Sequence, residues 1–345
     1  MGHTIDLENY SLRTDIIFDV ITEQMENDLN LKKEQFGNIK VEEILIEEKL
    51  SKSIGKKEGY YKSISFADVT DKENYLDVQK VFCKTLKTML EECNIEDHNS
   101  CLIIGLGNKK STPDSLGPNV LNHILVTRHL FMLGEVENGY RNTSLIEPNV
   151  TGVTGIETFN TVNGIVKETN PDFVIIVDAL ASSSISRVNK MIQLSSAGIE
   201  PGSGVFNNRM ELSEKTLGIP VIVIGIPTVV DATTIVSDTF QYMMRQFKYK
   251  IDKKDSSSLK LIPEFKQDYL NHKEELNKEE KEDLLGIIGT LSKEEFKLLI
   301  NEVLTPINSN LMVTPKEVDF VIEKFASLIG TGINKVLHQN EKLTN

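Results

Sequence analysis

The chain has 345 residues, 39% hydrophobic content and a formal net charge of −13, which is enough for one large core or two modest ones. The acidic balance argues against a nucleic-acid binder, as does the lack of a dense Lys/Arg run with interleaved aromatic residues. Apolar stretches are shorter than ten residues, too short to span a membrane. We expect a cytoplasmic protein, because no secretory signal is recognisable and the three cysteines show no CxxC spacing.

Two antiparallel strands and a helix are predicted in the first third of the chain. Residues 39–50 are rich in Ile and Val, and residues 60–66 in aromatic and β-branched side chains, with Gly55 and Gly59 in the linker between them. Residues 74–93 carry apolar side chains at helical spacing. This pattern predicts a β-hairpin followed by a helix that packs on a core.

Strands alternate with helices in the middle of the chain. Short apolar runs closed by turn residues are typical of strands buried on both faces. Such alternation predicts an α/β fold with a mainly parallel, twisted sheet covered by helices on both faces. The predicted strands are 102–107, 143–147, 173–178, 190–195 and 220–227, and the predicted helices are about 115–131, 155–169 and 232–247.

The last part of the chain is predicted to be helical. Residues 252–285 are dense in mixed charge, which is typical of a solvated helix face or a mobile loop. Helical segments are expected at about 279–289, 292–304 and 314–327. For the last of these, Thr314 is the expected N-cap, because Pro315 and Glu317 follow it in the pattern of a capping box.

Two aspartates follow apolar runs and are the leading candidates for chemistry. Asp114 lies shortly after the run that begins at Leu102, and Asp178 closes the run that begins at Phe173. Ligands and chemistry gather at the carboxyl ends of strands in open α/β sheets, so the two acids could form an acid/base pair. From spacing alone, a helix cap is the favoured interpretation of Asp114. A purely structural role explains Asp178 less readily, because a buried carboxylate is costly unless it is paired, hydrogen-bonded or protonated.

The remaining motifs are weaker candidates for functional sites. Asp231 ends the last strand unit and is expected to be a helix cap, with a supporting catalytic role as the second interpretation. The Gly105-Leu-Gly107 turn lacks the third glycine of a dinucleotide fingerprint. The histidines lack HExxH or HxH spacing, so no metal site is expected. No G-x-S-x-G motif is present, and the glycine-rich stretch 198–204 is expected to be a mobile or substrate-facing loop rather than a phosphate-binding one.

Taken together, the motifs resemble the spore germination protease family. The similarity spans residues 5 to about 330 and is carried by five stretches, which are far more specific in combination than singly. They are Asp6-Leu-Glu-Asn-Tyr-Ser-Leu-Arg-Thr-Asp15, Gly105-Leu-Gly-Asn with Thr112-Pro-Asp-Ser-Leu-Gly-Pro118, Val177-Asp-Ala-Leu-Ala-Ser182, Gly198-Ile-Glu-Pro-Gly-Ser-Gly204 with Asn207 and Arg209, and Pro227-Thr-Val-Val-Asp231-Ala.

The resemblance implies a specific enzyme. Such proteins are endopeptidases of the forespore and spore core that degrade small acid-soluble DNA-binding proteins during germination, without a cofactor. Their fold is similar to that of hydrogenase maturation proteases. The family's catalytic aspartates fall on Asp114 and Asp178, and Gly202, Ser203 and Gly204 are candidates for substrate binding.

The resemblance also implies processing and assembly. The family is made as an inactive homotetrameric zymogen that removes its own N-terminal segment, and the cleaved bond falls between Asp15 and Ile16. We therefore expect a propeptide at 1–15 and a single peptidase domain at 16–345, with its α/β core at about 100–248 and a helical part at about 279–330. No direct contact with nucleic acid or membrane is expected.

Two alternatives stay open at this point. The first is a metal-dependent endopeptidase of the hydrogenase-maturation type, which would lose activity to a chelator. The second is a non-enzymatic nucleotide-binding protein that uses the Gly105-Leu-Gly107 turn, which would bind nucleotide without proteolysis. If the enzyme interpretation holds, two close carboxyl groups divide their pKa values, so the site should work at mildly acidic pH.

Overall fold

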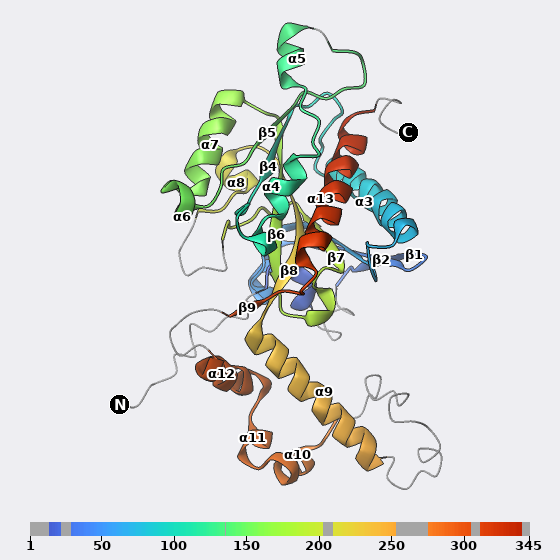
Figure 1. The fold of residues 1–345 in the computed structure, drawn as a ribbon, viewed down its shortest axis with the longest axis vertical. Coiled ribbons are helices and arrows are strands. Elements are labelled where there is room, and N and C mark those ends of the chain that lie inside the picture. Colours follow the sequence, from blue (N-terminus) through green and yellow to red (C-terminus); the bar gives the residue numbers. More distant parts are fainter. Residues whose placement is uncertain are drawn as a thin grey trace. The chain divides into compact units, whose positions relative to one another are not determined.

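The computed structural model describes residues 14–21, 29–134, 136–202, 210–252, 275–304 and 311–339. The chain forms two compact units (Figure 1). The larger, called the sheet unit here, comprises Arg13–Ser182, Ser186–Val229 and Thr314–Asn345, and the smaller, called the helical unit, comprises Met1–Leu12, Ser183–Ile185 and Val230–Val313. The boundary predicted after Asp15 concerns processing rather than folding, and it stays a prediction.

The strands of the described residues form one mixed sheet. Its order is β1-β2-β3-β7-β8-β6-β4-β5, with β9 paired to the end of β8. β4 is parallel to both β5 and β6, whereas β1, β2, β3 and β7 pair antiparallel in succession. The strands are β1 (Lys32–Phe36), β2 (Ile39–Ile46), β3 (Gly59–Ser65), β4 (Cys101–Gly105), β5 (Thr143–Ile146), β6 (Phe173–Ser182), β7 (Met191–Ser195), β8 (Val221–Asp231) and β9 (Met312–Val313).

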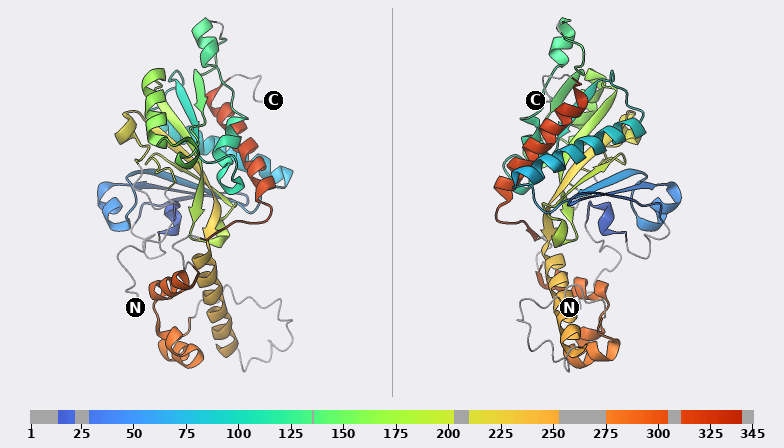
Figure 2. Two further views of the ribbon diagram at one scale, coloured as in Figure 1. Left: turned by 60° about the vertical axis from the view of Figure 1, so that its left-hand side comes forward. Right: turned by 90° about the vertical axis from the view of Figure 1, so that its right-hand side faces the viewer.

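Helices cover both faces of the sheet, as Figure 2 shows for the sheet unit. α3, α4 and α13 pack together on one face, and α7 packs on the other. The helices are α2 (Glu48–Ile54), α3 (Lys72–Glu92), α4 (Leu116–Leu121), α5 (Arg128–Leu133), α6 (Thr151–Thr154), α7 (Thr158–Thr169), α8 (Glu214–Leu217), α9 (Ala232–Asp252), α10 (Lys278–Leu285), α11 (Ile287–Thr290), α12 (Lys293–Leu304) and α13 (Val318–Leu337). The predicted α/β class is confirmed.

Successive side chains of the central strands point to opposite faces of the sheet, and both faces are covered. This explains why these strands are continuous apolar runs in the sequence. In β6, Ile175 faces the core shared with α3 and α13, whereas Val174 and Ile176 face the core shared with α7. All three side chains are fully buried. Because successive side chains point to opposite faces, a strand covered on both faces needs an apolar residue at every position.

A third apolar cluster lies beside the antiparallel strands. The short helical turn η2 (Ile17–Asp19) directly follows Ile16. The side chains of Ile16, Ile17 and Phe18 pack in one cluster with Leu180 and Met191. Ile16 and Ile17 are fully buried. The chain directly after Asp15 therefore belongs to the core of the sheet unit.

Three sequence-based expectations need correction. The segment 39–50 leaves the strand after Ile46 and enters α2, so a helix separates β2 from β3. The helix expected at 115–131 is interrupted between α4 and α5, where the N–H of Thr127 bonds to the carbonyl of Thr143 in β5. The Thr314 hydroxyl donates to the carbonyl of Thr228 instead of capping, and α13 starts at Val318.

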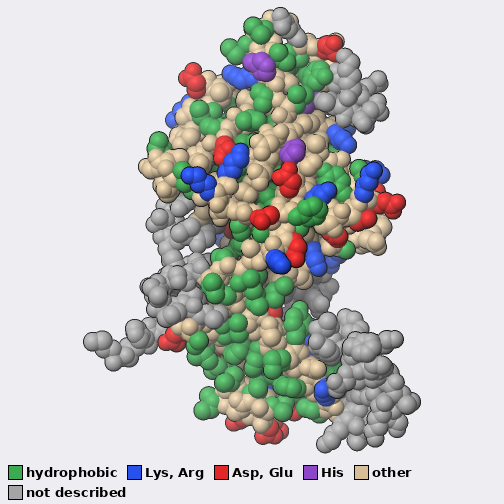
Figure 3. All heavy atoms as spheres, viewed as in Figure 1, with side chains coloured by type: hydrophobic (Ala, Val, Ile, Leu, Met, Phe, Trp, Pro, Cys, Tyr) green, Lys and Arg blue, Asp and Glu red, His purple; other side chains and the backbone are tan. Residues whose placement is uncertain are grey.

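The helical unit contains α9, α10, α11 and α12. Asn277 caps α10 through a capping box with Glu280, whose carboxylate also pairs with Lys248 of α9 at 3.0 Å. Several apolar side chains of this unit are exposed, and Figure 3 shows them gathered over these helices. They include Val236, Tyr242, Met243, Leu284, Ile287 and Ile288. Within the described residues, no helix is both long and apolar enough to cross a membrane.

Candidate active site

The parallel pairing of β4 and β6 brings the two predicted aspartates together. Gly105 at the end of β4 lies opposite Val177, and the next N–H, that of Leu106, donates to the Val177 carbonyl at 2.9 Å. The loop after β4 therefore begins beside Asp178. This loop leads through the turn η3 (Thr112–Asp114), which carries Asp114.

Backbone contacts hold the loop that carries Asp114. The N–H of Asn108 donates to the carbonyl of Asp114 at 2.9 Å, and the hydroxyl of Thr228 in β8 donates to the carbonyl of Pro113 at 2.7 Å. Gly107 has a φ of 114°, and a Cβ there would lie 2.0 Å from the Asp114 carbonyl oxygen. A glycine is required at this position, because the turn needs both a positive φ and a close backbone approach.

Both carboxyl groups have raised pKa values. Burial raises the pKa of Asp114 to about 6, against a smaller opposing effect of the Asn108 N–H. The pKa of Asp178 lies well above its ordinary value because of burial first, and then because of the negative charges of Asp114 and Asp15. Because the charge of Asp114 acts on Asp178, the two carboxyl groups lie in one electrostatic environment, in which they cannot both ionise cheaply.

The amino-terminal segment of the described chain runs along the end of β6, next to Asp178. The N–H of Asp15 donates to the carbonyl of Ala181 at 3.0 Å, and the N–H of Ala181 donates to the Asp15 carboxylate at 2.8 Å. Lys56 donates to the carbonyl of Thr14 at 2.6 Å. The segment that contains the predicted cleavage bond is therefore hydrogen-bonded to the strand that supplies one of the two candidate catalytic groups.

A second set of contacts anchors the residues after that bond. The Gln193 side chain in β7 bonds to the carbonyl of Asp15 and to the N–H of Ile17. Arg187 forms an ion pair with Asp19 at 2.9 Å and donates to the carbonyl of Phe18. Sequence reasoning missed Lys56, Arg187 and Gln193. Only Gln193 carried a recognisable signal, since it is a polar residue inside the apolar run Met191-Ile-Gln-Leu.

Gly117 controls how closely α4 approaches the two strands. A Cβ at this position would lie 2.2 Å from the carbonyl oxygen of Leu106 and 2.5 Å from that of Val177, both of them backbone atoms. We expect Gly117→Ala to lower the free energy of unfolding by about 1–3 kcal/mol, as overpacking does, and to move the Asp114 loop. Chemical unfolding measures the change in the free energy of unfolding. Gly164→Ala is the control, because it meets open space inside α7 and should be neutral or stabilising; equal losses in both variants would contradict the expectation.

The other predicted site residues are placed differently. Asp231 accepts a hydrogen bond from the N–H of Thr233 at 2.7 Å, which is the geometry of a cap at the start of α9. Gly202 has a φ of 68°, whereas Ser203 and Gly204 lie outside the described residues. A catalytic role for Asp231 and a substrate-binding role for loop 198–204 stay predictions.

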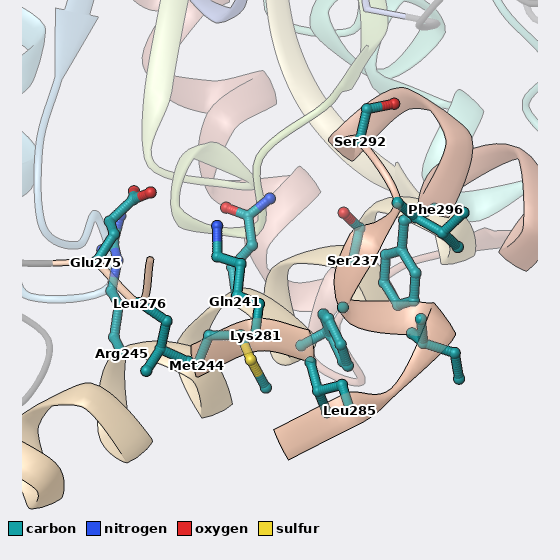
Figure 4. A pocket seen from close by; sticks show the side chains of 14 residues that line it. Ser237, Gln241, Met244, Arg245, Glu275, Leu276, Lys281, Leu285, Ser292 and Phe296 are labelled. Atoms are coloured by element: carbon teal, nitrogen blue, oxygen red, sulfur yellow. The ribbon is translucent and has the colours of Figure 1, made fainter. Parts of the chain in front are cut away.

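A cavity of about 260 Å³ lies within the helical unit (Figure 4). Side chains from α9, α10, α11 and α12 line it together with Glu275 and Leu276, and Arg245, Glu275 and Lys281 are among its polar groups. None of the site residues expected from the sequence lines this cavity. Over the ranges that the structure describes, no three His, Cys, Asp or Glu side chains converge as a metal ion would require.

An α/β protein with one buried and one half-buried carboxyl group beside a segment of its own chain has the constituents of a hydrolase acting on peptides. The family model described as germination protease matches residues 15–345. A germination protease from Geobacillus sp. (strain WCH70) is 44% identical over 360 residues, covering 98% of this chain and 97% of that protein. One from Priestia megaterium is 42% identical and covers 98% of this chain and 96% of that protein. The chain belongs to the germination protease family, and this membership implies a peptidase.

Among solved structures, a crystal structure of the NiFe hydrogenase maturation protease HycI from Thermococcus kodakarensis is similar to part of the chain. The TM-score is 0.28 at 17% identity, over 42% of this chain and 80% of that chain. A match of this extent carries no argument about the site.

Proposed function

We propose that the chain is an endopeptidase of spores that is made as a zymogen and first cuts its own bond between Asp15 and Ile16. One observation carries this proposal. The segment that contains this bond is hydrogen-bonded to β6 at Ala181, three residues beyond Asp178. The charge of Asp15 also acts on Asp178, since it contributes to the raised pKa of that carboxyl.

Occupation of the site by the chain's own segment explains an inactive precursor. As long as Asp15 accepts the Ala181 N–H, the acidic side chain of another polypeptide cannot take the same position. Cleavage after Asp15 would release residues 1–15, whereas the buried Ile16 and Ile17 would stay in the core. The vacated position would then accept a substrate with an acidic residue before a large apolar one.

The proposed reaction needs a single proton on the carboxyl pair. Asp178 holds this proton, because it is the more deeply buried group, and donates a hydrogen bond to the scissile carbonyl oxygen. The carboxylate of Asp114 takes a proton from water as the water oxygen bonds to the carbonyl carbon of Asp15. Asp114 then returns a proton to the nitrogen of Ile16 as the C–N bond breaks.

Substrates and assembly follow from the family resemblance. We propose small acid-soluble DNA-binding spore proteins as substrates, a homotetramer as the assembly, the spore core as the location and no cofactor. The relatives named germination protease, at 42–44% identity over nearly the whole chain, support this proposal.

Self-cleavage of the full-length protein at pH 6 tests the proposal. We expect intact-mass spectrometry to show loss of residues 1–15, with no effect of a chelator. The rate should be about 50-fold higher at pH 6 than at pH 4, because a base with a pKa of about 6 is half ionised at pH 6 and about 1% ionised at pH 4. An uncut chain at both pH values would contradict the proposal, and cleavage abolished by chelator would favour the metal-dependent alternative.

A further inference from the structure

Gln193 is a buried polar side chain whose position the proposed acid/base chemistry does not explain. It lies in β7 between fully buried apolar neighbours, and 6% of its surface is exposed. A buried amide is costly unless its donors and acceptor are bonded. Its side chain lies on the same face of β7 as Met191, two residues before it, which packs against Ile16 and Ile17.

Two hydrogen bonds of the Gln193 side chain go to the backbone around the bond proposed to be cut. Nε2 donates to the carbonyl oxygen of Asp15 at 3.0 Å, and Oε1 accepts from the N–H of Ile17 at 2.9 Å. The orientation of the amide follows from its partners, because a carbonyl oxygen only accepts and a backbone N–H only donates. One side chain thus holds both sides of the Asp15–Ile16 peptide.

The contact with the Asp15 carbonyl is chemically specific. This oxygen gains negative charge when water adds to the carbonyl carbon, so a donor already at 3.0 Å needs no rearrangement as that charge develops. Lys56, by comparison, donates to the carbonyl of Thr14, one residue earlier. The amide of Gln193 is therefore aimed at the reacting carbonyl, and the lysine at its neighbour.

We propose that Gln193 is a catalytic residue of self-cleavage, with Nε2 as an oxyanion donor and Oε1 as the group that holds the chain on the leaving side. This inference rests on the proposed function, because it requires cleavage after Asp15. The carboxyl groups move protons in this scheme, while Gln193 stabilises the charge on oxygen and fixes the peptide. Side-chain amides that serve as oxyanion donors contribute about 10²–10³-fold to the rate.

The first test compares two buried glutamines in the full-length protein. Gln193→Met is expected to slow the appearance of the chain lacking residues 1–15 by about 10²–10³-fold at pH 6, measured by intact mass. Gln79→Met is the control: Gln79 has the same 6% exposure and bonds to Leu328 and Thr331 of α13. This control should cleave within about threefold of wild type. Each rate is measured at a temperature at which circular dichroism shows the variant folded.

The second test separates donation by Nε2 from mere packing. Gln193→Glu keeps the shape and the acceptor for Ile17, but it donates to the Asp15 carbonyl only when protonated. Its cleavage rate, divided by the wild-type rate at the same pH, is expected to be highest at low pH, where the glutamate is protonated, and to fall by up to about 100-fold as the glutamate ionises. A ratio that stays constant with pH would overturn the inference, as would wild-type rates in folded Gln193→Met. Failure of the wild-type chain to cleave after Asp15 would instead overturn the proposed function.

Discussion

Asp178→Asn is expected to keep residues 1–15 attached to the chain and to slow cleavage after Asp15 by about 10³-fold or more. Asparagine has nearly the shape of the protonated carboxyl, and its amide can still donate a hydrogen bond to a carbonyl oxygen. It cannot exchange a proton with Asp114, so the pair loses the shared proton on which the proposed reaction depends. Intact mass at pH 6 over several days measures the residual rate. Asp77→Asn, at an exposed position of α3, is the matched control.

Asp178→Asn should also be more stable than the wild type at high pH. The pKa of Asp178 is raised in the folded state by burial and by the charges of Asp114 and Asp15. Folding therefore takes up a proton wherever the unfolded carboxyl is ionised, and the wild-type free energy of unfolding falls as the pH rises above the unfolded pKa of about 3.9. Asparagine has no proton to lose, so the Tm difference between variant and wild type should grow from pH 4 to pH 8. For the cleavage prediction, an Asp178→Asn chain that is cut at the wild-type rate would show that the carboxyl pair is structural.

Much of the fold could be predicted because its central strands are buried on both faces. The apolar runs of β4 and β6 indicate where these strands begin, and the parallel pairing of the two strands puts the loop after β4 beside β6. This reasoning predicted that Asp114 and Asp178 lie near each other, and the charge of Asp114 does act on Asp178. It placed Asp178 at a strand end, however, whereas β6 continues to Ser182, where Asp15 pairs with Ala181. Pairing with a distant segment leaves no local pattern in the sequence.

The contacts around Asp15 could not be predicted for a related reason. Gln193 reaches Asp15 across 178 positions of sequence, and its place depends on β7 lying next to β3 and β8. Nothing in the local pattern of β7 specifies that order. The interruption between α4 and α5 has the same kind of origin, because the N–H of Thr127 bonds to the carbonyl of Thr143 in β5 rather than to the preceding helix. Tertiary hydrogen bonds override the apolar periodicity in both places.

Arg187→Met is expected to lower the free energy of unfolding by about 3–5 kcal/mol, because it removes the guanidinium that pairs with the buried carboxylate of Asp19. The Asp19 side chain is 1% exposed and lies 2.9 Å from the guanidinium. Hydroxyl groups of Thr14 and Ser182 also donate to it, at 2.6 and 2.9 Å. These hydroxyls stabilise the charge but do not neutralise it. Thermal and chemical unfolding monitored by circular dichroism measure the loss.

An exposed ion pair supplies the control for Arg187. Lys80 pairs with Asp77 at 3.2 Å on the surface of α3, with side chains that are 76% and 63% exposed. Lys80→Met should change the free energy of unfolding by less than about 1 kcal/mol, because solvent screens such pairs. Adding Asp19→Asn to Arg187→Met should recover part of the loss, since the buried negative charge is then gone. A loss in the double variant equal to the sum of the single losses would mean that the pair is not coupled.

Arg187→Met also tests whether the residues after the bond proposed to be cut stay anchored. Arg187 also donates to the carbonyl of Phe18 at 2.8 Å, so its removal loosens the chain that directly follows Ile16 and Ile17. Self-cleavage needs the Asp15 carbonyl held in place, and we therefore expect slower cleavage in Arg187→Met even well below its Tm. Limited proteolysis of the cleaved wild type should leave Ile16 as the amino terminus, because this residue is fully buried. Trimming of the cleaved chain beyond Phe18 by an added protease would contradict a fixed anchor.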